Sequence, residues 1–300
     1  MTEQATEAWT HHEAIFNGLR FHYVSQGEGP LVLLLHGFPE FWFSWRFQLP
    51  ALAAAGFRAV AVDLRGYNLS EKPQGVGSYD TKHLVADTAA MLRELGSEEG
   101  GYLVGHDWGG VIAWHTARHH PELVKKLVVL NAPHPDRYLE VLRKMPAQLL
   151  KAYYIAFFQL PWLPERLLTF GNGTAVEMAL RGSGIDAAHL SAAEARQYRE
   201  AITQPGAATA ALNYYRSMGR RILMGGRSGN GKRRSIEMPT LLLWGIHDVA
   251  LDSSNAEYEE LRRWVPNLRV EPINASHWVQ VDAPDEVNAK LLAFLTEDTA

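Results

Sequence analysis

Cysteine is absent from the 300 residues of this chain, which excludes disulfides, thiolate nucleophiles and cysteine-bound metals. A large excess of either charge is also missing, because 29 Lys and Arg oppose 33 Asp and Glu, for a formal net charge of -4. A basic footprint for nucleic acid or anionic lipid is therefore not expected. The 47% of hydrophobic and 21% of charged residues are typical of a globular protein with a large core.

Long apolar runs are missing as well. The most apolar stretch, residues 147–164, is interrupted by Lys151, Gln159 and Pro161, so it is too short and too broken to span a membrane. The N-terminal residues are polar and acidic and lack the apolar segment of a signal peptide. We therefore expect no stable membrane anchor and a cytoplasmic location.

Short β-like runs alternate with longer helical patterns along most of the chain. The strand candidates are residues 20–26, 31–37, 58–64, 101–107, 125–131, 240–246 and 268–274, and the helix candidates include 81–95, 109–120, 254–265 and 284–295. Continuously apolar strands separated by helices indicate a parallel sheet covered on both faces, so the predicted fold class is α/β. The alternation fails between about Pro133 and Pro239, which predicts a helical insertion after the strand that ends at Asn131.

The sequence GHDWG, residues 105–109, has the small-x-nucleophile-x-small form of a nucleophile elbow, with Asp107 at its centre. Residues two positions before and after the nucleophile must lack bulk so that strand and helix can meet. The N-terminus of the following helix keeps a carboxylate ionised. An aspartate that only caps the helix is the plainer interpretation of the same five residues.

A second turn precedes this elbow, in the sequence LLLHGFPE after an early strand. It places the backbone N–H of Phe38 where it can meet that of Trp108 on a developing oxyanion. A Gly-Pro turn explains Gly37 and Pro39, but it does not explain their position at a strand end ahead of the elbow.

Two later strands end near an acid and a histidine. Asp248 follows the strand at 240–246, and His277 follows the last strand. Alone, each is ordinary, since an aspartate after a strand is usually a turn residue. The order nucleophile, acid, histidine is nevertheless that of the α/β-hydrolase triad. His247 competes for the role of base, but it lies beside the acid rather than beyond the final strand.

The helix after the elbow carries His115 and His119, four residues apart and followed by His120, a spacing that could ligate a metal. No carboxylate joins this cluster, and cationic residues suit the end of a helix. We therefore expect no metal.

With these residues in hand, the chain resembles the α/β-hydrolase-fold epoxide hydrolases and, more broadly, the group that includes haloalkane and fluoroacetate dehalogenases. The similarity runs from Ala14 to Leu295 and is densest at HGFPEFWFSWRFQLPALAAAGFRAVAVDLRGYNLSEKP, GHDWGG and SHWVQVDAPDEVN. The resemblance implies a mostly parallel eight-stranded sheet, with helices on both faces and a helical lid after the sixth strand. Residues 1–132 and 239–300 would form the core domain, and residues 133–238 the cap.

In this family the lid supplies two tyrosines that donate hydrogen bonds to the epoxide oxygen. The sequence LNYYRSM looks like the second tyrosine motif, and its asparagine-x-tyrosine-arginine pattern selects Tyr215 over Tyr214. The first motif falls on KAYYIAFFQLPW, where the following FFQ selects Tyr154 and leaves Tyr153 as the alternative. Without the resemblance, both tyrosine motifs would be interpreted as aromatic residues in the core of a helical lid.

The resemblance also implies a mechanism without cofactor or metal, in which Asp107 attacks an epoxide carbon and forms a hydroxyalkyl ester. Water activated by His277, itself oriented by Asp248, would then hydrolyse the ester to a vicinal diol. A serine could not replace the aspartate, because an alkyl ether on serine has no carbonyl for water to attack.

Two other functions stay open. A dehalogenase forms the same aspartyl ester, but fluoroacetate dehalogenases carry arginines where this chain has Trp108 and Val111, and haloalkane dehalogenases commonly have a halide-binding asparagine or tryptophan where it has Phe38. A catalytically silent binding protein would show a damaged triad, and this one is complete. The oligomeric state is open, and a homodimer is among the expectations.

The expected lid also contains an apolar group of residues, Phe157, Phe158, Leu160, Trp162 and Leu163. They indicate an apolar substrate if they line a cleft. A packed helical core predicts the same residues, so the sequence leaves both interpretations open.

Overall fold

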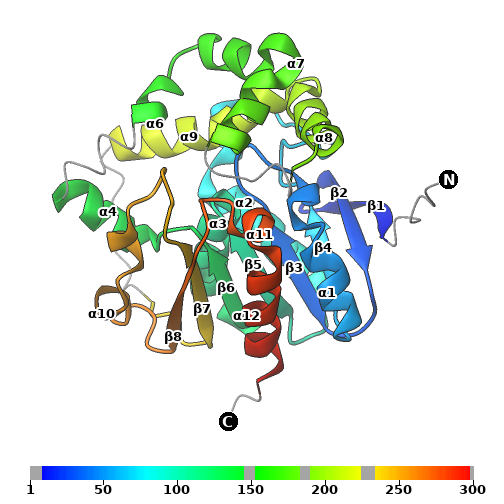
Figure 1. The fold of residues 1–300 in the computed structure, drawn as a ribbon, viewed down its shortest axis with the longest axis vertical. Coiled ribbons are helices and arrows are strands. Elements are labelled where there is room, and N and C mark those ends of the chain that lie inside the picture. The colour runs from blue at the N-terminus through cyan, green and yellow to red at the C-terminus, as the bar shows by residue number, and fades with distance from the viewer. Residues whose placement is uncertain (1–8, 145–152, 183–189, 224–233, 298–300) are drawn as a thin grey trace.

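The computed structural model describes residues 9–144, 153–182, 190–223 and 234–297. One eight-stranded sheet, in the order β1-β2-β4-β3-β5-β6-β7-β8, runs through its centre (Figure 1). β2 pairs antiparallel with β1 and β4, and the other neighbours are parallel. The strands are β1 (Thr10–Phe16), β2 (Leu19–Gln26), β3 (Leu31–Leu35), β4 (Arg58–Val62), β5 (Gly101–His106), β6 (Val124–Leu130), β7 (Thr240–Gly245) and β8 (Leu268–Ile273).

Helices cover both faces of this sheet, with α1 and α12 in front and α2 and α3 behind (Figure 1). The described α-helices are α1 (Gln48–Ala54), α2 (Thr81–Leu95), α3 (Trp108–His119), α4 (Pro135–Lys144), α6 (Tyr153–Phe157), α7 (Leu163–Gly182), α8 (Ala192–Thr203), α9 (Ala207–Leu223), α10 (Tyr258–Leu261), α11 (Val279–Asp282) and α12 (Pro284–Thr296). Short 3-10 helices are η1 (Trp42–Trp45), η2 (Val76–Tyr79), η3 (Pro121–Leu123) and η4 (Ser253–Ala256). The predicted α/β class is confirmed.

The first strand was not among the seven candidates. β1 pairs with β2 through a tight turn at Asn17 and Gly18, which have φ values of 49° and 76°. An Asn-Gly pair between two strands is a strong signal for such a hairpin, because both turn residues need a positive φ. That signal was present in the sequence and identifies the eighth strand.

The helix predicted over residues 254–265 is broken in the structure. It is replaced by η4 and by the four-residue α10, and Glu257 between them is extended, with a ψ of 111°. Asp252 caps η4 by accepting a hydrogen bond from the backbone N–H of Ser254. The carboxylate of Glu257 lies 2.7 Å from Arg137 on α4, so a tertiary ion pair accompanies the break in the helix.

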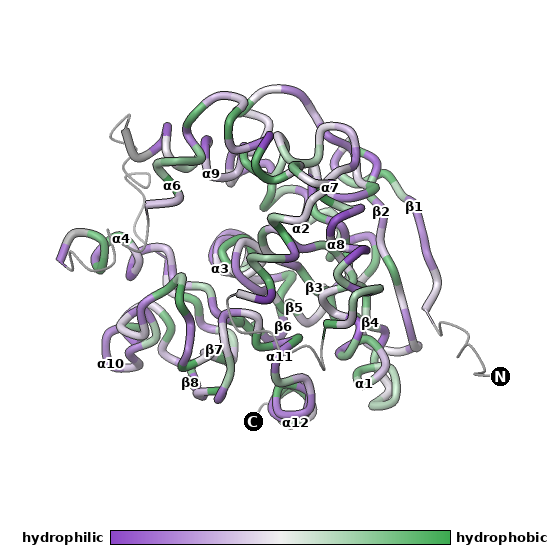
Figure 2. Tube along the Cα trace, turned by 45° about the horizontal axis from the view of Figure 1, so that its top comes forward, coloured by the Kyte–Doolittle hydropathy of each residue, from purple (hydrophilic) through white to green (hydrophobic). Residues whose placement is uncertain are grey.

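The central strands are largely apolar, which is what burial on both faces favours. Every residue of β3 is buried, as is every residue of β7, and Figure 2 shows the central strands largely in the hydrophobic colours. Because β3, β5, β6, β7 and β8 run parallel, their carboxyl ends meet at one edge of the sheet. Side chains that follow these strands are therefore brought together.

The described residues between β6 and β7 are helical, as predicted, and α6 to α9 lie above the carboxyl edge of the sheet in Figure 1. Residues 147–152 of the apolar stretch lie outside the described residues. Within the described part of the chain, no helix has both the length and the apolar character needed to cross a membrane.

Candidate active site

Asp107 stands on a strained turn between β5 and α3. Its φ of 47° and ψ of -117° are unusual for a residue with a side chain and match the sharp turn of a nucleophile elbow. The glycines on either side have no room for a side chain. A Cβ on Gly105 would lie 2.4 Å from the carbonyl oxygen of Gly109, and a Cβ on Gly109 would lie 2.1 Å from that of Leu35. The close contact between strand and helix therefore requires both glycines.

The carboxylate of Asp107 points to the turn that follows β3. The backbone N–H of Phe38 donates to its Oδ1 at 2.8 Å, and a Cβ on Gly37 would lie 2.5 Å from the Cβ of Asp107. Trp108 is the first residue of α3, so its backbone N–H is among the donors that have no carbonyl partner within a helix. Of the two N–H groups expected to stabilise an oxyanion, that of Phe38 is hydrogen-bonded to Asp107, and that of Trp108 lies at the start of α3.

His277 lies between two carboxylates. Its Nδ1 is 2.7 Å from Oδ2 of Asp248, and its Nε2 is 3.7 Å from Oδ2 of Asp107. Asp248 is held in turn by the backbone N–H groups of Ala250 and Leu251, which donate to its Oδ1 at 2.8 and 2.9 Å. The structure therefore brings together the three residues that the chain order had suggested.

The protonation of His277 depends on these two carboxylates. Burial alone would lower the pKa of His277, but the charges of Asp248 and Asp107 and their hydrogen bonds raise it well above its ordinary value of 6.5. Burial raises the pKa of Asp248, yet attraction to His277 and hydrogen bonds from His277 and Asn131 bring it below its ordinary value. The free site therefore favours an imidazolium between two carboxylates.

Two tyrosines approach this triad from the helices above the sheet. Tyr154 on α6 and Tyr215 on α9 have ring centroids 5.9 Å apart. The ring of Tyr215 lies 5.2 Å from those of Trp108 and Phe38. Burial is the largest cause that raises the pKa of both phenols well above 10, and the charge of Asp107 contributes in both, so both carry their protons at neutral pH.

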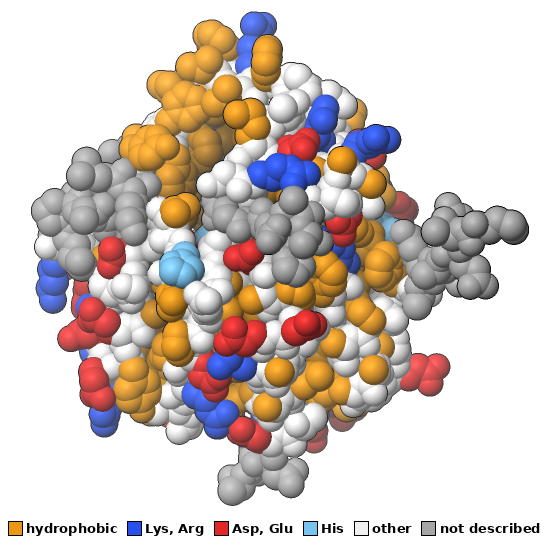
Figure 3. All heavy atoms as spheres, viewed as in Figure 1, with side chains coloured by type: hydrophobic (Ala, Val, Ile, Leu, Met, Phe, Trp, Pro, Cys, Tyr) orange, Lys and Arg blue, Asp and Glu red, His pale blue; other side chains and the backbone are white. Residues whose placement is uncertain are grey.

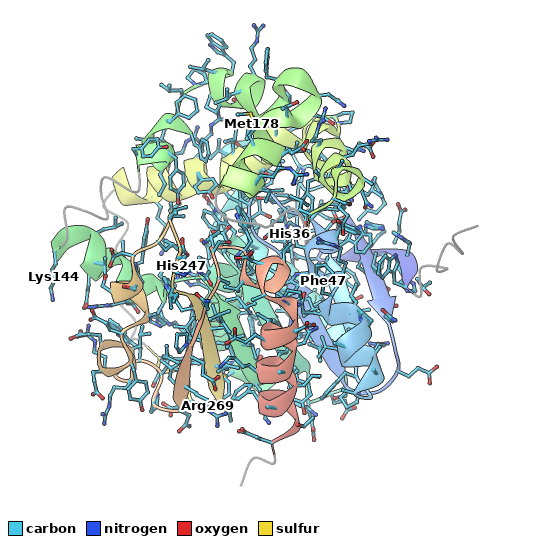
Figure 4. The ribbon with its side chains drawn as sticks, viewed as in Figure 1. His36, Phe47, Lys144, Met178, His247 and Arg269 are labelled. Carbon is cyan, nitrogen blue, oxygen red and sulfur yellow. The ribbon has the colours of Figure 1, made fainter. Side chains whose placement is uncertain are left out.

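The alternative residues lie elsewhere. Tyr153 is 74% exposed, and the hydroxyl of Tyr214 donates to the backbone oxygen of Arg65 at 2.8 Å. His247 is exposed at the end of β7, as Figure 4 shows, and its Nε2 lies 2.9 Å from Oδ1 of Asn274. None of these three side chains is hydrogen-bonded to Asp107.

Asn131 belongs to the site, and the sequence reasoning assigned it no role. It directly follows β6 and has a φ of 41°. Its Nδ2 donates to Oδ2 of Asp248 at 2.7 Å, and its Oδ1 accepts from the N–H of Gly245. A polar residue at the end of an apolar strand next to the elbow was the signal that could have found it.

A second buried network lies behind the nucleophile. Glu40 is within 2.7 Å of Nδ1 of His106 and accepts hydrogen bonds from the N–H of Gly37 and the amide of Gln280, both at 2.8 Å. His106 also bonds to the backbone oxygen of His277 at 2.8 Å. This network therefore connects the turn after β3 with the loop that carries His277.

The network should stabilise the fold in a pH-dependent way. Burial raises the pKa of Glu40, but attraction to His106 and hydrogen bonds from His106 and Ser44 lower it to about 2, below its ordinary 4.5. We expect Glu40→Gln to reduce the free energy of unfolding by about 3 kcal/mol at pH 7. The loss should shrink as the pH falls from 4.5 toward 2, since the wild-type carboxylate then gains its proton.

Urea unfolding of the wild type and of Glu40→Gln over a series of pH values measures the difference in their free energies of unfolding. The exposed Glu13→Gln, which breaks only a surface ion pair with Arg20, is the control and should cost below about 1 kcal/mol. A loss for Glu40→Gln that does not change with pH would contradict the role of the charge.

In the described part of the chain, no group of three or more His, Asp or Glu side chains is arranged so that it could hold a metal ion. The rings of His115 and His119 stack with centroids 6.2 Å apart, and burial, followed by the charge of Arg118, lowers the pKa of His115 to about 3. The expected absence of a metal stays a prediction.

Comparison with known proteins agrees with this geometry. A family model described as the alpha/beta hydrolase fold matches residues 30–284. Together with the sheet order and the elbow, this match defines the class as an α/β hydrolase. The chain is 40% identical to human "Epoxide hydrolase 4" over 94% of this chain and 77% of that protein, and 39% identical to "AB hydrolase superfamily protein YfhM" of Bacillus subtilis over 93% of this chain and 95% of the other.

Solved structures are similar as well. An epoxide hydrolase of Bacillus megaterium in complex with an inhibitor has a TM-score of 0.87 at 32% identity, covering 95% of this chain and all of the other. The epoxide hydrolase VrEH1 of Vigna radiata has a TM-score of 0.82 at 30% identity, covering 96% of this chain and 98% of the other. The chain therefore belongs to the epoxide hydrolases of the α/β-hydrolase fold.

Proposed function

We propose that this protein hydrolyses epoxides to vicinal diols through an ester on Asp107. One observation carries the proposal: a carboxylate, rather than a hydroxyl, stands at the elbow beneath two protonated phenols. A carboxylate can displace the oxygen from an epoxide carbon and leave an ester that water can cleave.

In the first step, one oxygen of Asp107 attacks an epoxide carbon. Oδ1 accepts from Phe38 N–H, so Oδ2 is the oxygen available for attack. The carbon–oxygen bond of the ring breaks, and the departing oxygen keeps the electron pair and takes a proton from Tyr154 or Tyr215. General acid catalysis of this kind contributes about 10²- to 10⁴-fold in rate.

In the second step, His277 takes a proton from water as the water oxygen attacks the carbonyl carbon of Asp107. Ester formation has by then removed the negative charge of Asp107, one of the two charges that raise the pKa of His277, so the imidazolium can give up its proton, which returns to the phenolate left by the first step. Backbone N–H groups of Phe38 and Trp108 stabilise the oxyanion. Collapse of the intermediate breaks the bond to the alkyl oxygen, which takes the remaining proton of the attacking water, so Asp107 is restored as a carboxylate and the diol is released.

The two phenols favour an epoxide over a halide as the leaving group. A departing halide needs no proton, whereas the oxygen of an opened epoxide must gain one. Tyr154 and Tyr215 are therefore better matched to a leaving oxygen that stays attached to the substrate.

We further propose that residues 133–238 form the cap and that residues 1–132 and 239–300 form the core domain. α8 and α9 in the cap are tied to the core by the ion pair between Arg46 and Glu194, by Tyr214 on the oxygen of Arg65, and by a hydrogen bond from Ser217 to Asp80. Substrate would bind between the two parts, with no cofactor. The cytoplasmic location and the homodimer stay predictions.

Detection of the covalent ester on Asp107 tests the proposed mechanism. His277→Gln, incubated with a panel of epoxides, should accumulate an adduct on Asp107 equal to the whole mass of one epoxide, because ring opening proceeds and hydrolysis stops. Intact-mass spectrometry and peptide mapping measure it. His247→Gln is the matched control and should turn over epoxides without an adduct.

A folded His277→Gln protein that shows no adduct would contradict covalent catalysis. An adduct formed from haloalkanes but not from epoxides would assign the site to dehalogenation instead.

A further inference from the structure

Many apolar side chains of the cap face solvent. Figure 3 shows hydrophobic side chains gathered on the surface over the region of α6 and α7. Trp162 is 62% exposed and Phe170 is 76% exposed, and Leu160 and Leu163 are exposed as well. Leu160, Trp162 and Leu163 therefore do not pack in the core of the cap, which was one of the two interpretations left open by the sequence. These side chains do not hold α6 in place.

α6, which carries Tyr154, depends on contacts with the rest of the protein. It has five residues, and none of them is fully buried. A helix of this length is unstable by itself in water. Phe158, just after α6, packs its ring against those of Tyr154 and Tyr215, with centroids 5.6 and 5.0 Å apart. Ring contacts of this kind allow sliding and rotation, so hydrogen bonds, which are directional, are needed to fix the place of α6.

Gln159 links the two tyrosine motifs. Its Nε2 donates to the backbone oxygen of Ile155 at 3.0 Å and to that of Tyr215 at 3.1 Å. The amide nitrogen carries two hydrogens, one for each carbonyl. Because Ile155 directly follows Tyr154 in α6, one side chain joins the backbones that carry the two phenols.

Arg216 makes a second link beside the first. It directly follows Tyr215, and its guanidinium donates to the backbone oxygens of Phe158 at 3.0 Å and Leu160 at 2.6 Å. It also pairs with both carboxylate oxygens of Glu165, at 2.6 and 3.0 Å. Carbonyls at the end of a helix lack partners within the helix and attract a cation. Arg216 on α9 therefore secures the end of α6.

A glycine in α9 makes room for the amide of Gln159. Gly219 stands four residues after Tyr215, and a Cβ there would lie 2.7 Å from Oε1 and 2.9 Å from Nε2 of Gln159. The φ of Gly219 is not among the positive values, so its backbone does not need glycine. Glycine is unfavourable inside a helix. The space required by Gln159 therefore accounts for glycine at this position.

We propose that Gln159 and Arg216, which we call the tyrosine clasp, are positioning residues for the two phenols. The proposal rests on the proposed function, in which both phenols serve one epoxide oxygen and must therefore be held to within about 0.5 Å. Tyr215 lies in the 17-residue α9, whereas Tyr154 lies in the five-residue α6. Loss of the clasp displaces the shorter helix, so it acts on the reaction through Tyr154.

Hydrogen exchange of the full chain measures the clasp without any epoxide. Gln159→Leu has a similar size and lacks the two donors. Backbone amides at α6, such as that of Phe158, which donates to the oxygen of Tyr154 at 2.9 Å, should exchange about tenfold faster in this variant. Mass spectrometry of peptides from residues 153–160 follows the exchange. Arg216→Lys should act in the same direction, because lysine lacks the planar fork of donors.

Arg199→Met is the matched control within the cap. Arg199 on α8 also donates to backbone oxygens of a neighbouring helix, those of Asn172 at 2.9 Å and Gly171 at 3.1 Å in α7. Its loss should speed exchange in α7 and leave both the exchange of α6 and the rate of ester formation unchanged.

Single-turnover rates with an epoxide measure the positioning role. Gln159→Leu should slow ester formation about tenfold and leave ester hydrolysis unchanged. In the Tyr154→Phe background the same change should have no further effect on ester formation, because the donor that it positions is already missing. Gly219→Ala should also slow ester formation, since its Cβ displaces the amide of Gln159 although alanine favours the helix.

The results separate this proposal from the proposed function. Unchanged exchange at α6 in Gln159→Leu overturns the clasp. Equal slowing of ester formation by Gln159→Leu with and without Tyr154 overturns the positioning role, because a general loss of structure acts in both backgrounds. A wild type that forms no ester from any epoxide overturns the proposed function and with it the positioning role, while the exchange of α6 still reports on the clasp.

Discussion

Asp107→Asn is expected to lower epoxide turnover by about 10⁴-fold or more, because a carboxamide is a far weaker nucleophile than a carboxylate. Asparagine has nearly the size of aspartate, and its side-chain oxygen can still accept from the N–H of Phe38, which donates at 2.8 Å in the wild type. The loss therefore reports on chemistry rather than on the shape of the elbow. Steady-state turnover measures the loss of chemistry, and a thermal melt of the same sample measures whether the fold is intact.

The same substitution should also lower the pKa of His277. In the wild type, burial opposes protonation of His277, and Asp248 and Asp107 together overcome it. Removal of the charge of Asp107, which lies 3.7 Å from Nε2, leaves only Asp248 to raise the pKa. NMR titration of the imidazole measures the change, and it mimics the neutral ester that precedes the hydrolytic step.

Asp252→Asn serves as the control for both measurements. Asp252 caps η4 and lies in the loop after Asp248, so its charge is removed at a similar place in the chain. Turnover and the pKa of His277 should stay close to wild type. A pKa of His277 that is unchanged in Asp107→Asn would show that the nucleophile does not control the base.

Removal of the phenols is expected to have the second largest effect, and to act on one step only. Tyr154→Phe and Tyr215→Phe should each slow ester formation by about 10²-fold or more, because the departing oxygen loses a proton donor. The double variant should slow it further, by about 10⁴-fold, if the two donors act independently. Hydrolysis of the ester should change little, since His277 and Asp248 carry that step.

Rapid-quench measurements of a single turnover separate the two rates. Tyr153→Phe is the control for Tyr154 because that side chain is 74% exposed, and it should leave both rates unchanged. Tyr214→Phe is the control for Tyr215; loss of its hydrogen bond to Arg65 should cost about 1 kcal/mol in stability rather than ester formation. Equal losses in both steps for Tyr215→Phe would indicate a structural role.

Much of the framework could be predicted from local patterns. The apolar runs of β3, β5, β6 and β7 were recognisable because strands buried on both faces have no room for polar residues. The elbow was recognisable because its two glycines are demanded by contacts within a few residues or with the adjacent strand. The single helix predicted over residues 254–265 was wrong, since the backbone is extended at Glu257. The ion pair between Glu257 and distant Arg137 that accompanies the break cannot be read from the local sequence.

Residues of the candidate site could be predicted only where their order in the chain and their position after a strand indicated them. The nucleophile, acid and histidine could be named because each follows a strand, and parallel strands end at one edge. Asn131, which holds Asp248, and the pair of Glu40 and His106 behind the nucleophile were not recognised, because their importance comes from partners more than 60 residues away in the chain.

The sequence by itself determined the chemistry available to this protein. Asp107 in a small-x-Asp-x-small turn allows an ester that water can cleave, and the absence of cysteine excludes thiolate chemistry. Only the tertiary structure decided which aromatic residues serve the site and which face solvent. Neighbouring tyrosines such as Tyr153 and Tyr154 are chemically identical in a sequence, and they differ because helix packing turns one toward Tyr215 and leaves the other exposed. The same packing decided that Trp162 and Phe170 lie on the outside of the cap.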